Sequence, residues 1–270
     1  MKYLLVIFII ILNILGIITL IMNIIEYYNS LSKLNIPIYY INMDKHVDRN
    51  IFMLEQFKDI SNFKRISGVD VSKQNKYKIN VKSKYKKMNN GEIGCTLAHL
   101  NAIEQFLKDG HDYALICEDD ANFELQEYWK YSLRSIAKLL SIKDPEWTSC
   151  HLYHNYKSKS NNYKSKSSNN KFKFKSIVES DEVYGTVAYL ISKRNALQLK
   201  ELTNNFTILQ NPENVDPRAD YFIYYRENTK PYILIPAIIN LNTETTSSIH
   251  NKDDEHNFKH SEYIKKQFIK

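Results

Sequence analysis

Three consecutive acidic residues, Glu118, Asp119 and Asp120, follow directly on the apolar run at residues 113–117. In an extended chain successive side chains point to opposite sides, so we expect Glu118 and Asp120 on one side and Asp119 on the other. Carboxylates this close repel one another, and burial raises the cost unless a cation lies between them. A hard divalent cation such as Mg²⁺ or Mn²⁺ suits oxygen ligands and keeps positions open for substrate phosphates. The acidic block therefore predicts a metal site.

The same block has a simpler explanation, which the sequence alone leaves open. Acidic residues are common near helix N-termini, because they complement the partial positive charge there. Residues 118–120 would then cap the following helix and face solvent. The metal interpretation instead requires them in a crevice at the carboxyl ends of the strands, which is where open α/β sheets bind their ligands.

Apolar and β-branched runs alternate with helical patterns along the rest of the chain. The predicted strands are residues 36–42, 63–71, 112–117, 148–154, 183–191 and 231–241. The predicted helices are a segment ending at Phe57, residues 89–112, residues 125–140 and a helix capped by Ser192. A helix between two strands indicates βαβ units, so we expect an α/β fold with a mainly parallel central sheet flanked by helices.

The segment at residues 89–112 carries the strongest helical pattern, and Gly110 is a suitable stop after it. At 100° per residue, Glu92 and His99 lie on one face of this helix. A histidine on a helix is more often a hydrogen-bonded structural residue than a catalyst, and we assign His99 the structural role. Gly94 would allow a close backbone approach.

The N-terminal segment differs in composition from the rest of the chain. Residues 3–25 contain no charged side chain and are mainly Ile and Leu. As a helix this stretch would span about 34 Å, enough to cross a bilayer. It predicts a transmembrane signal-anchor at residues 1–26 and a stalk at 27–35, with a cleaved signal peptide or a buried helix as the alternatives. Charge asymmetry favours a cytosolic N-terminus, so the remaining chain is expected to be lumenal or extracytoplasmic.

The net charge of +7, from 37 basic and 30 acidic residues, comes from two lysine-rich segments. Residues 73–87 and 157–175 each hold seven lysines and no acid, and the remainder carries −7. We read them as solvated loops, the second within a low-complexity loop at residues 155–176. No recognition motif accompanies the charge, so we expect no nucleic-acid partner. Three cysteines do not make a disulfide framework.

Five motifs occur in an order that resembles glycosyltransferase family 25, which includes lipopolysaccharide and procollagen galactosyltransferases. They are IPIYYINMDKHVDRN, FKRISGVD, GEIGCTLAHLNAIEQFLKDG, YALICEDDANF and VYGTVAYLISKRNALQL. The resemblance covers most of residues 36–250, which we take as the catalytic domain, followed by a polar tail at 251–270. It implies a GT-A-like fold, a UDP-sugar donor, a divalent metal ion (Mn²⁺ or Mg²⁺) and an inverting transfer.

The resemblance also implies roles for individual residues. Glu118 and Asp120 match the acidic metal signature, with Asp119 beside them at the diphosphate. A base must deprotonate the acceptor hydroxyl in an inverting transfer, and Asp216 is the leading candidate with Asp220 in reserve. The residues implied for donor binding are Asn42, Asp44, Arg49, Arg65, Asp70 and Glu92. For Arg49 an ion pair with Asp48 or Glu55 is the alternative.

The sequence therefore predicts an enzyme that moves a hexose, with galactose as the expected sugar, from UDP-galactose to a hydroxyl of a glycan or protein acceptor. A catalytically inactive relative that binds a glycan or a nucleotide-sugar is the first alternative. A lysine-rich, membrane-tethered binder of anionic polymers is the second, and it would show a steep dependence on salt.

Overall fold

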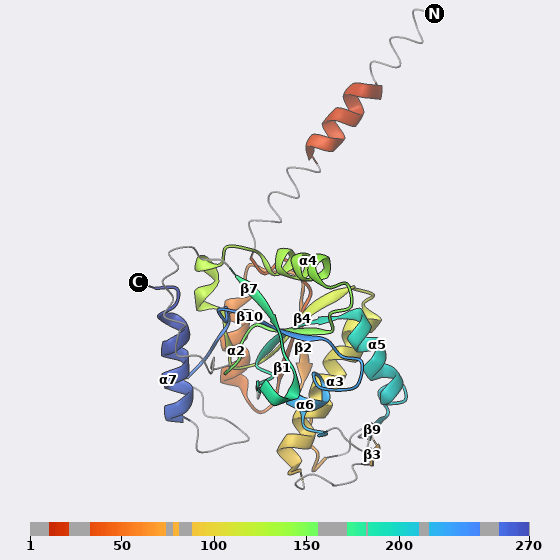
Figure 1. Ribbon diagram of the computed structural model, residues 1–270, viewed down its shortest axis with the longest axis vertical. Helices are drawn as coiled ribbons and strands as arrows, with labels where there is room; N and C mark the ends of the chain where they lie inside the picture. The colour runs from red at the N-terminus through yellow and green to blue at the C-terminus, as the bar shows by residue number, and fades with distance from the viewer. Residues whose placement is uncertain are drawn as a thin grey trace, which may run out of the picture.

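The computed structural model describes residues 11–21, 33–73, 78–80, 88–155, 172–181, 183–210, 216–243 and 254–269. Its centre is a seven-stranded sheet in the order β2-β1-β4-β8-β6-β10-β7 (Figure 1). Its strands are β1 (Ile38–Asn42), β2 (Phe63–Ser67), β4 (Tyr113–Glu118), β6 (Ser149–His151), β7 (Lys173–Ser176), β8 (Ala188–Ser192) and β10 (Pro231–Ile235). Two small sheets pair β3 (Lys78–Asn80) with β9 (Ile208–Gln210) and β5 (Ala121–Asn122) with β11 (Asn240–Leu241).

Most strands of the central sheet run in one direction. β1 is parallel to β2 and to β4, and β6 is parallel to β10. β8 runs antiparallel to both β4 and β6, and β7 antiparallel to β10. The α/β class with a central, mainly parallel sheet is thus consistent with the structure. The reversal of β8 places its first residues at the edge of the sheet where β4 ends.

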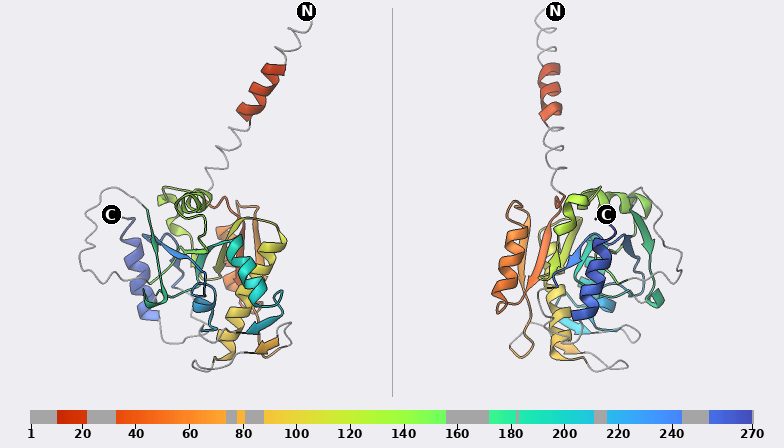
Figure 2. Two further views of the ribbon diagram at one scale, coloured as in Figure 1. Left: turned by 45° about the vertical axis from the view of Figure 1, so that its right-hand side comes forward. Right: turned by 90° about the vertical axis from the view of Figure 1, so that its left-hand side faces the viewer.

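Helices cover both faces of the sheet. They are α2 (Val47–Gln56), α3 (Asn90–Lys108), η1 (Glu124–Tyr128), α4 (Leu133–Lys143), η2 (Glu179–Asp181), α5 (Lys193–Leu202), α6 (Ala219–Phe222) and α7 (Asp254–Lys265). Alternate β1 residues separate the two cores: Tyr39 packs with α3, α5 and α6, whereas Tyr40 packs with α2, α4 and α7. Figure 2 shows α7 on the opposite side of the molecule from α3 and α5. β1 is buried throughout, as expected of a strand covered on both faces.

The predicted stop at Gly110 and the predicted cap at Ser192 are confirmed. Asn89 caps α3 in a capping box with Glu92, and Gly110 follows its end at φ +77°. Ser192 caps α5 through its side chain. The single helix predicted at residues 125–140 is instead two elements, η1 and α4, because Ser132 starts a new helix by accepting the backbone N–H of Ser135.

Two segments expected to be irregular contain regular structure. β7 lies at the end of the predicted lysine-rich loop and pairs with β10. α7 lies in the predicted polar tail, where Ile264 is 1% exposed in the core. Residues 156–171 of the predicted loop, and residues 74–77 and 81–87 of the first lysine-rich segment, lie outside the described residues.

The prediction of an N-terminal transmembrane helix is contradicted. Residues 11–21 are the described part of this stretch, and they are helical. Among the described residues, no helix combines the length and apolarity needed to cross a membrane. The single-pass localisation, with the catalytic domain lumenal or extracytoplasmic, was derived from that helix and is corrected with it.

Gly94 holds α3 against the loop that follows β2. A Cβ atom at this position would lie 2.4 Å from the carbonyl oxygen of Val69, so the helix or the loop would have to move. We therefore expect Gly94→Ala to lower the free energy of unfolding by about 1–3 kcal/mol. Urea denaturation checks this, with Lys108→Ala on the exposed side of the same helix as a control. Equal stability of Gly94→Ala and wild type would contradict the close approach.

Two buried histidines make stability depend on pH. Burial, and for His151 also the nearby His154, lowers the pKa of His151 to about 3, and burial lowers that of His154 to about 4. The unfolded chain binds these protons below about pH 6.5, so stability falls as pH falls. From pH 7 to pH 5 each histidine costs about 2 kcal/mol. We expect His154→Gln to remove about half of this loss in urea titrations at the two pH values; an unchanged slope would contradict it.

Candidate active site

The acidic block lies at the carboxyl end of β4. Glu118 is the last residue of the strand, and its backbone N–H donates to the carbonyl of Val187 just before β8. Asp119 and Asp120 form the turn that follows, well before η1 begins at Glu124. Asp119 is only 5% exposed. The alternative, in which residues 118–120 cap the following helix and face solvent, therefore does not agree with the structure.

Asp119 is held by two side chains from the first strand and helix. Arg49 donates from Nη1 to Asp119 Oδ1 at 2.5 Å, and Asn42 donates from Nδ2 to Oδ2 at 2.7 Å. Arg49 Nη1 also lies 3.9 Å from Asp120 Oδ2. Arg49 thus pairs with the acidic block.

Glu118 accepts two hydrogen bonds on one of its oxygens. Thr186 Oγ1 donates to Oε1 at 2.5 Å, and His99 Nε2 lies 3.4 Å from the same atom. Burial alone would raise the pKa of Glu118, but the hydrogen bonds from His99 and Thr186 and the charges nearby lower it below its usual value. A lowered pKa keeps Glu118 ionised.

The surroundings of Asp120 shift its pKa in the opposite direction. Its Oδ1 is buried without a hydrogen-bond partner among the described residues. Burial, with the negative charge of Glu118, raises the pKa of Asp120 to about 7. Such a carboxylate needs either a proton or a cation that the described side chains do not fully provide.

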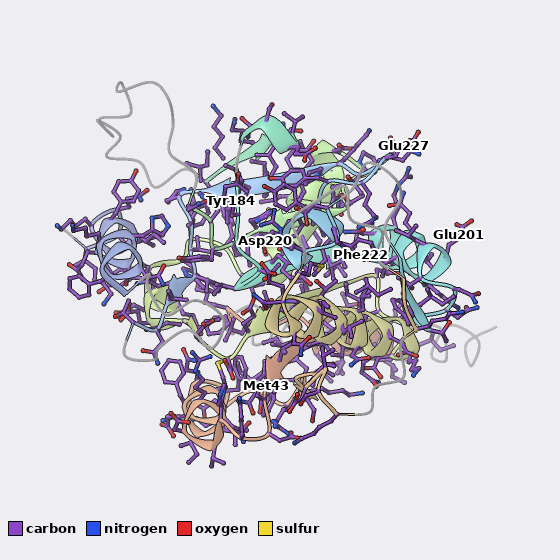
Figure 3. The ribbon with its side chains drawn as sticks, turned by 90° about the horizontal axis from the view of Figure 1, so that it is seen from below. Met43, Tyr184, Glu201, Asp220, Phe222 and Glu227 are labelled. Carbon is purple, nitrogen blue, oxygen red and sulfur yellow. The ribbon has the colours of Figure 1, made fainter. Side chains whose placement is uncertain are left out.

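Asp220 belongs to the same cluster and Asp216 does not. Asp220, in α6, accepts the N–H of Gly185 at 3.2 Å, and burial and the charge of Glu118 raise its pKa. Figure 3 shows Asp220 near the middle of the molecule. Asp216 instead accepts on both oxygens from Arg218, with a shortest contact of 2.5 Å. Of the two predicted bases, the structure brings only the reserve candidate next to the acidic block.

The segment between β7 and β8 joins the two carboxylates. Gly185, at φ +106°, donates its N–H to Asp220, and the next residue, Thr186, donates its hydroxyl to Glu118. A left-handed backbone of this kind favours glycine. Gly185 therefore lets two consecutive residues hold carboxylates from two different elements.

Two more of the predicted donor-binding residues, Arg65 and Asp44, extend the chain of contacts that Asn42 makes to Asp119. Arg65 Nε donates to Asn42 Oδ1 at 2.9 Å, and its Nη2 donates to Asp44 Oδ1 at 2.6 Å. The Arg65 hydrogen bond, followed by that of Ser67, lowers the pKa of Asp44. Asn42 thus connects this exposed pair to the buried Asp119.

The two remaining predicted residues make local contacts. Asp70 accepts the backbone N–H and the hydroxyl of Ser72. Glu92 accepts the backbone N–H of Asn89 at 2.8 Å in the capping box of α3. Neither contacts the acidic block, so their predicted donor contacts remain predictions.

Two residues that lie next to Glu118 were not predicted as site residues. Thr186 was not singled out, and Cys95 was considered only for disulfides. Ligand atoms of Cys95, His99 and Glu118 lie within 4.8 Å of one another, and burial raises the pKa of the Cys95 thiol. The i, i+4 spacing of Cys95 and His99 on a helix was the available signal for this pair.

Comparison with protein families decides the family. The profile of the family described as "Glycosyltransferase family 25 (LPS biosynthesis protein)" matches residues 35–217, more than half of the chain. The chain belongs to glycosyltransferase family 25. The resemblance inferred from the five motifs is thereby confirmed.

Curated proteins give the same family. The chain is 27% identical over 109 residues to "Procollagen galactosyltransferase 1" of Danio rerio, a match that covers 40% of this chain and 17% of that protein. It is 29% identical over 99 residues, 32% of this chain and 17% of the relative, to "Glycosyltransferase 25 family member" of Anopheles gambiae. Against "Procollagen galactosyltransferase 1-B" of Xenopus laevis it is 28% identical over 109 residues, with the same coverage of 40% and 17%. The matched region thus spans about a sixth of each of these relatives.

Proposed function

We propose that this member of family 25 transfers a hexose, galactose, from a UDP-sugar to a hydroxyl group on a glycan or protein acceptor, with inversion at the anomeric carbon. Family membership supports glycosyl transfer, and the procollagen galactosyltransferases among its relatives support the choice of galactose. The observation that carries the proposal is the convergence of Glu118, Asp120 and Asp220 at the carboxyl end of β4, beside a single segment that holds two of them.

The donor set fits a hard divalent cation. Asp120 has a buried oxygen without a partner among the described residues, and its raised pKa shows that its negative charge is poorly compensated. Glu118 stays ionised beside it. Asp120 and Glu118 would hold Mn²⁺ or Mg²⁺, which when bound would neutralise the charge on the departing UDP diphosphate.

Other side chains of the site would position the acidic turn and contact the nucleotide. Arg49 and Asn42 hold Asp119 by hydrogen bonds and would thereby position the turn that also carries Asp120. Asn42 and Arg65 extend this network toward the exposed side of β2, where a nucleotide would meet polar groups.

Asp220 is the group we propose to accept the proton of the attacking hydroxyl. Its raised pKa increases its affinity for a proton, and a base performs best when its pKa is near the working pH. Asp216 is less suited, because both of its oxygens already accept hydrogen bonds from the Arg218 guanidinium.

A donor screen tests the function. The full chain, supplied with Mn²⁺ and a mixture of simple glycosides and hydroxylysine-containing peptides as acceptors, is expected to release UDP fastest from UDP-galactose among a panel of UDP-sugars. Chelation of the metal with EDTA should abolish release. UDP binding without release from any donor would support the inactive nucleotide-sugar-binding alternative instead.

A further inference from the structure

We propose that Tyr189 and His99 form a positioning pair that fixes the orientation of Glu118, so that one carboxylate oxygen is held by protein donors and the other is presented to a divalent cation. This inference rests on the proposed function, because it assigns a cation to Glu118. It adds two residues, one on β8 and one on α3, that do not touch the substrate and act only through Glu118.

The first step of the argument is which oxygen of Glu118 is occupied. Both hydrogen-bonding neighbours, Thr186 Oγ1 at 2.5 Å and His99 Nε2 at 3.4 Å, lie on Oε1. Within the described part of the chain, Oε2 has no hydrogen-bond donor. Two donors on one oxygen restrict rotation of the carboxylate, which leaves Oε2 as the ligand atom.

The second step is the protonation of the His99 ring. Its Nδ1 lies 3.0 Å from the hydroxyl of Tyr189, and its Nε2 lies 3.4 Å from Glu118 Oε1. A neutral imidazole has one N–H and one acceptor nitrogen. A carboxylate oxygen accepts, so a ring with a single N–H carries it at Nε2, and the Tyr189 hydroxyl is the group within reach that can donate to Nδ1.

The third step is that the Tyr189 hydroxyl keeps its proton and that its ring is held in place. Its side chain is 0% exposed, and burial raises the pKa of its hydroxyl well above the usual value, so the proton stays on the oxygen. Its ring packs edge to face against Tyr224 at 5.4 Å. His99 is likewise 0% exposed. A fixed donor thus sets the orientation of a fixed ring.

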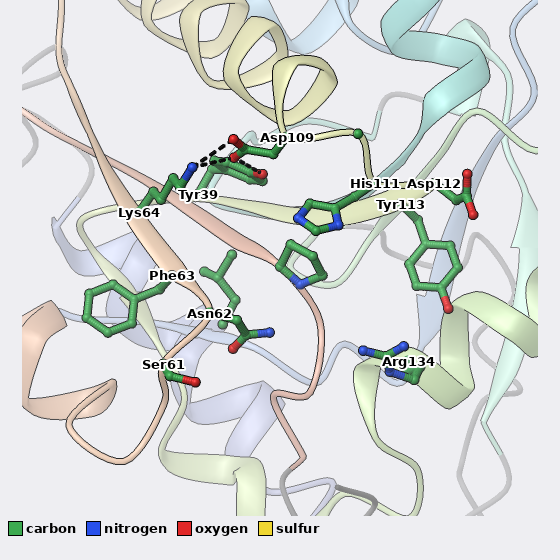
Figure 4. Close-up of a pocket in the computed structure, with 13 residues that line it drawn as sticks. Tyr39, Ser61, Asn62, Phe63, Lys64, Asp109, His111, Asp112, Tyr113 and Arg134 are labelled. Atoms are coloured by element: carbon green, nitrogen blue, oxygen red, sulfur yellow. Dashed lines mark hydrogen bonds and ion pairs between the residues drawn. The ribbon is translucent and has the colours of Figure 1, made fainter. Parts of the chain in front are cut away.

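The structure offers a matched control at the opposite edge of the sheet. Tyr39 is also a buried tyrosine, 1% exposed in the same hydrophobic core, and its hydroxyl donates to the carboxylate of Asp109 at 2.6 Å. That pair lines a pocket of about 620 Å³ where β1, β2 and β4 begin, away from the acidic block (Figure 4). Tyr39→Phe therefore removes an equivalent hydroxyl without touching Glu118.

Histidine NMR tests the protonation without requiring activity. In ¹⁵N-histidine-labelled full chain near neutral pH, the signal lost in His99→Gln is expected to show a protonated Nε2 and an unprotonated Nδ1. A ring protonated at Nδ1 would overturn the inference, because Tyr189 would then be the acceptor.

Titration with Mn²⁺ alone tests the positioning. We expect Tyr189→Phe to weaken Mn²⁺ binding about 10-fold relative to wild type, as removal of partners behind metal ligands does, and Tyr39→Phe to leave the affinity within about twofold of wild type. Equal affinities of Tyr189→Phe and Tyr39→Phe would overturn the pair. Absence of Mn²⁺ binding by wild type would instead count against the cation site of the proposed function, and the NMR result would still decide the orientation of His99.

Discussion

Asp120→Asn should lower the rate of UDP release from UDP-galactose at least about 100-fold, the scale on which loss of one electrostatic stabiliser acts in other enzymes. The amide has nearly the same shape but carries no charge for a cation. Burial and the neighbouring Glu118 already make the charge of Asp120 unfavourable, as its raised pKa shows. The variant should therefore be at least as stable as wild type when no metal is present. Initial rates at saturating Mn²⁺ and urea denaturation in EDTA measure the two effects.

The matched control for this substitution is Asp112→Asn. Asp112 is an exposed carboxylate just before β4, at the other end of the same strand. It should retain the wild-type rate. Wild-type turnover of Asp120→Asn would remove Asp120 from the metal site, and a large loss of stability in EDTA would show that its charge is compensated within the protein.

Arg49→Leu should destabilise the fold by about 3–5 kcal/mol, because it leaves the buried carboxylate of Asp119 without its cation. Asn42 would then be the remaining close donor to that carboxylate. Adding Asp119→Asn to Arg49→Leu should recover part of the loss, since the neutral amide no longer needs a cation. Free energies of unfolding from urea titrations check both variants.

Lys58→Ala is the control for this second prediction. Lys58 pairs with Glu55 at 2.8 Å, but both side chains are more than half exposed, so removal of the pair should change stability little. A loss for Arg49→Leu no larger than that of Lys58→Ala would contradict a structural role of the Arg49–Asp119 pair.

The elements that carry the site were predictable because their signals are local. The apolar run into the acids marks β4, and the Asn89 cap with Gly110 beyond it marks α3. The partners of the acids were only partly predictable. Arg49 and Asn42 were named as donor-binding residues, but their contact with Asp119 joins positions 70 and 77 residues apart, which periodicity does not report.

The direction of β8 was beyond the sequence pattern. A buried strand has the same composition whether it runs parallel or antiparallel to its neighbours. Only the fold shows that β8 runs antiparallel between β4 and β6, which places Gly185 and Thr186 beside the end of β4. The choice between Asp216 and Asp220 depended on the same information, because it is Gly185 that binds Asp220.

For the N-terminal segment, the sequence pattern led to a prediction that the structure contradicts. Its composition predicted a membrane-spanning helix, whereas no helix among the described residues combines the length and apolarity needed to cross a membrane. The helix within the polar tail was not predicted, for a different reason. α7 presents Ile264 and His260 to the core among many charged residues, so the apolar pattern of this helix is sparse.

Calorimetric titration of UDP into the full chain, with Mn²⁺ and then with EDTA, tests the central claim most directly. If the carboxylates at the end of β4 hold a cation that binds the diphosphate, UDP should bind at least about 10-fold more tightly with Mn²⁺, and Asp120→Asn should lose that difference. Equal UDP affinity with Mn²⁺ and with EDTA would contradict the account.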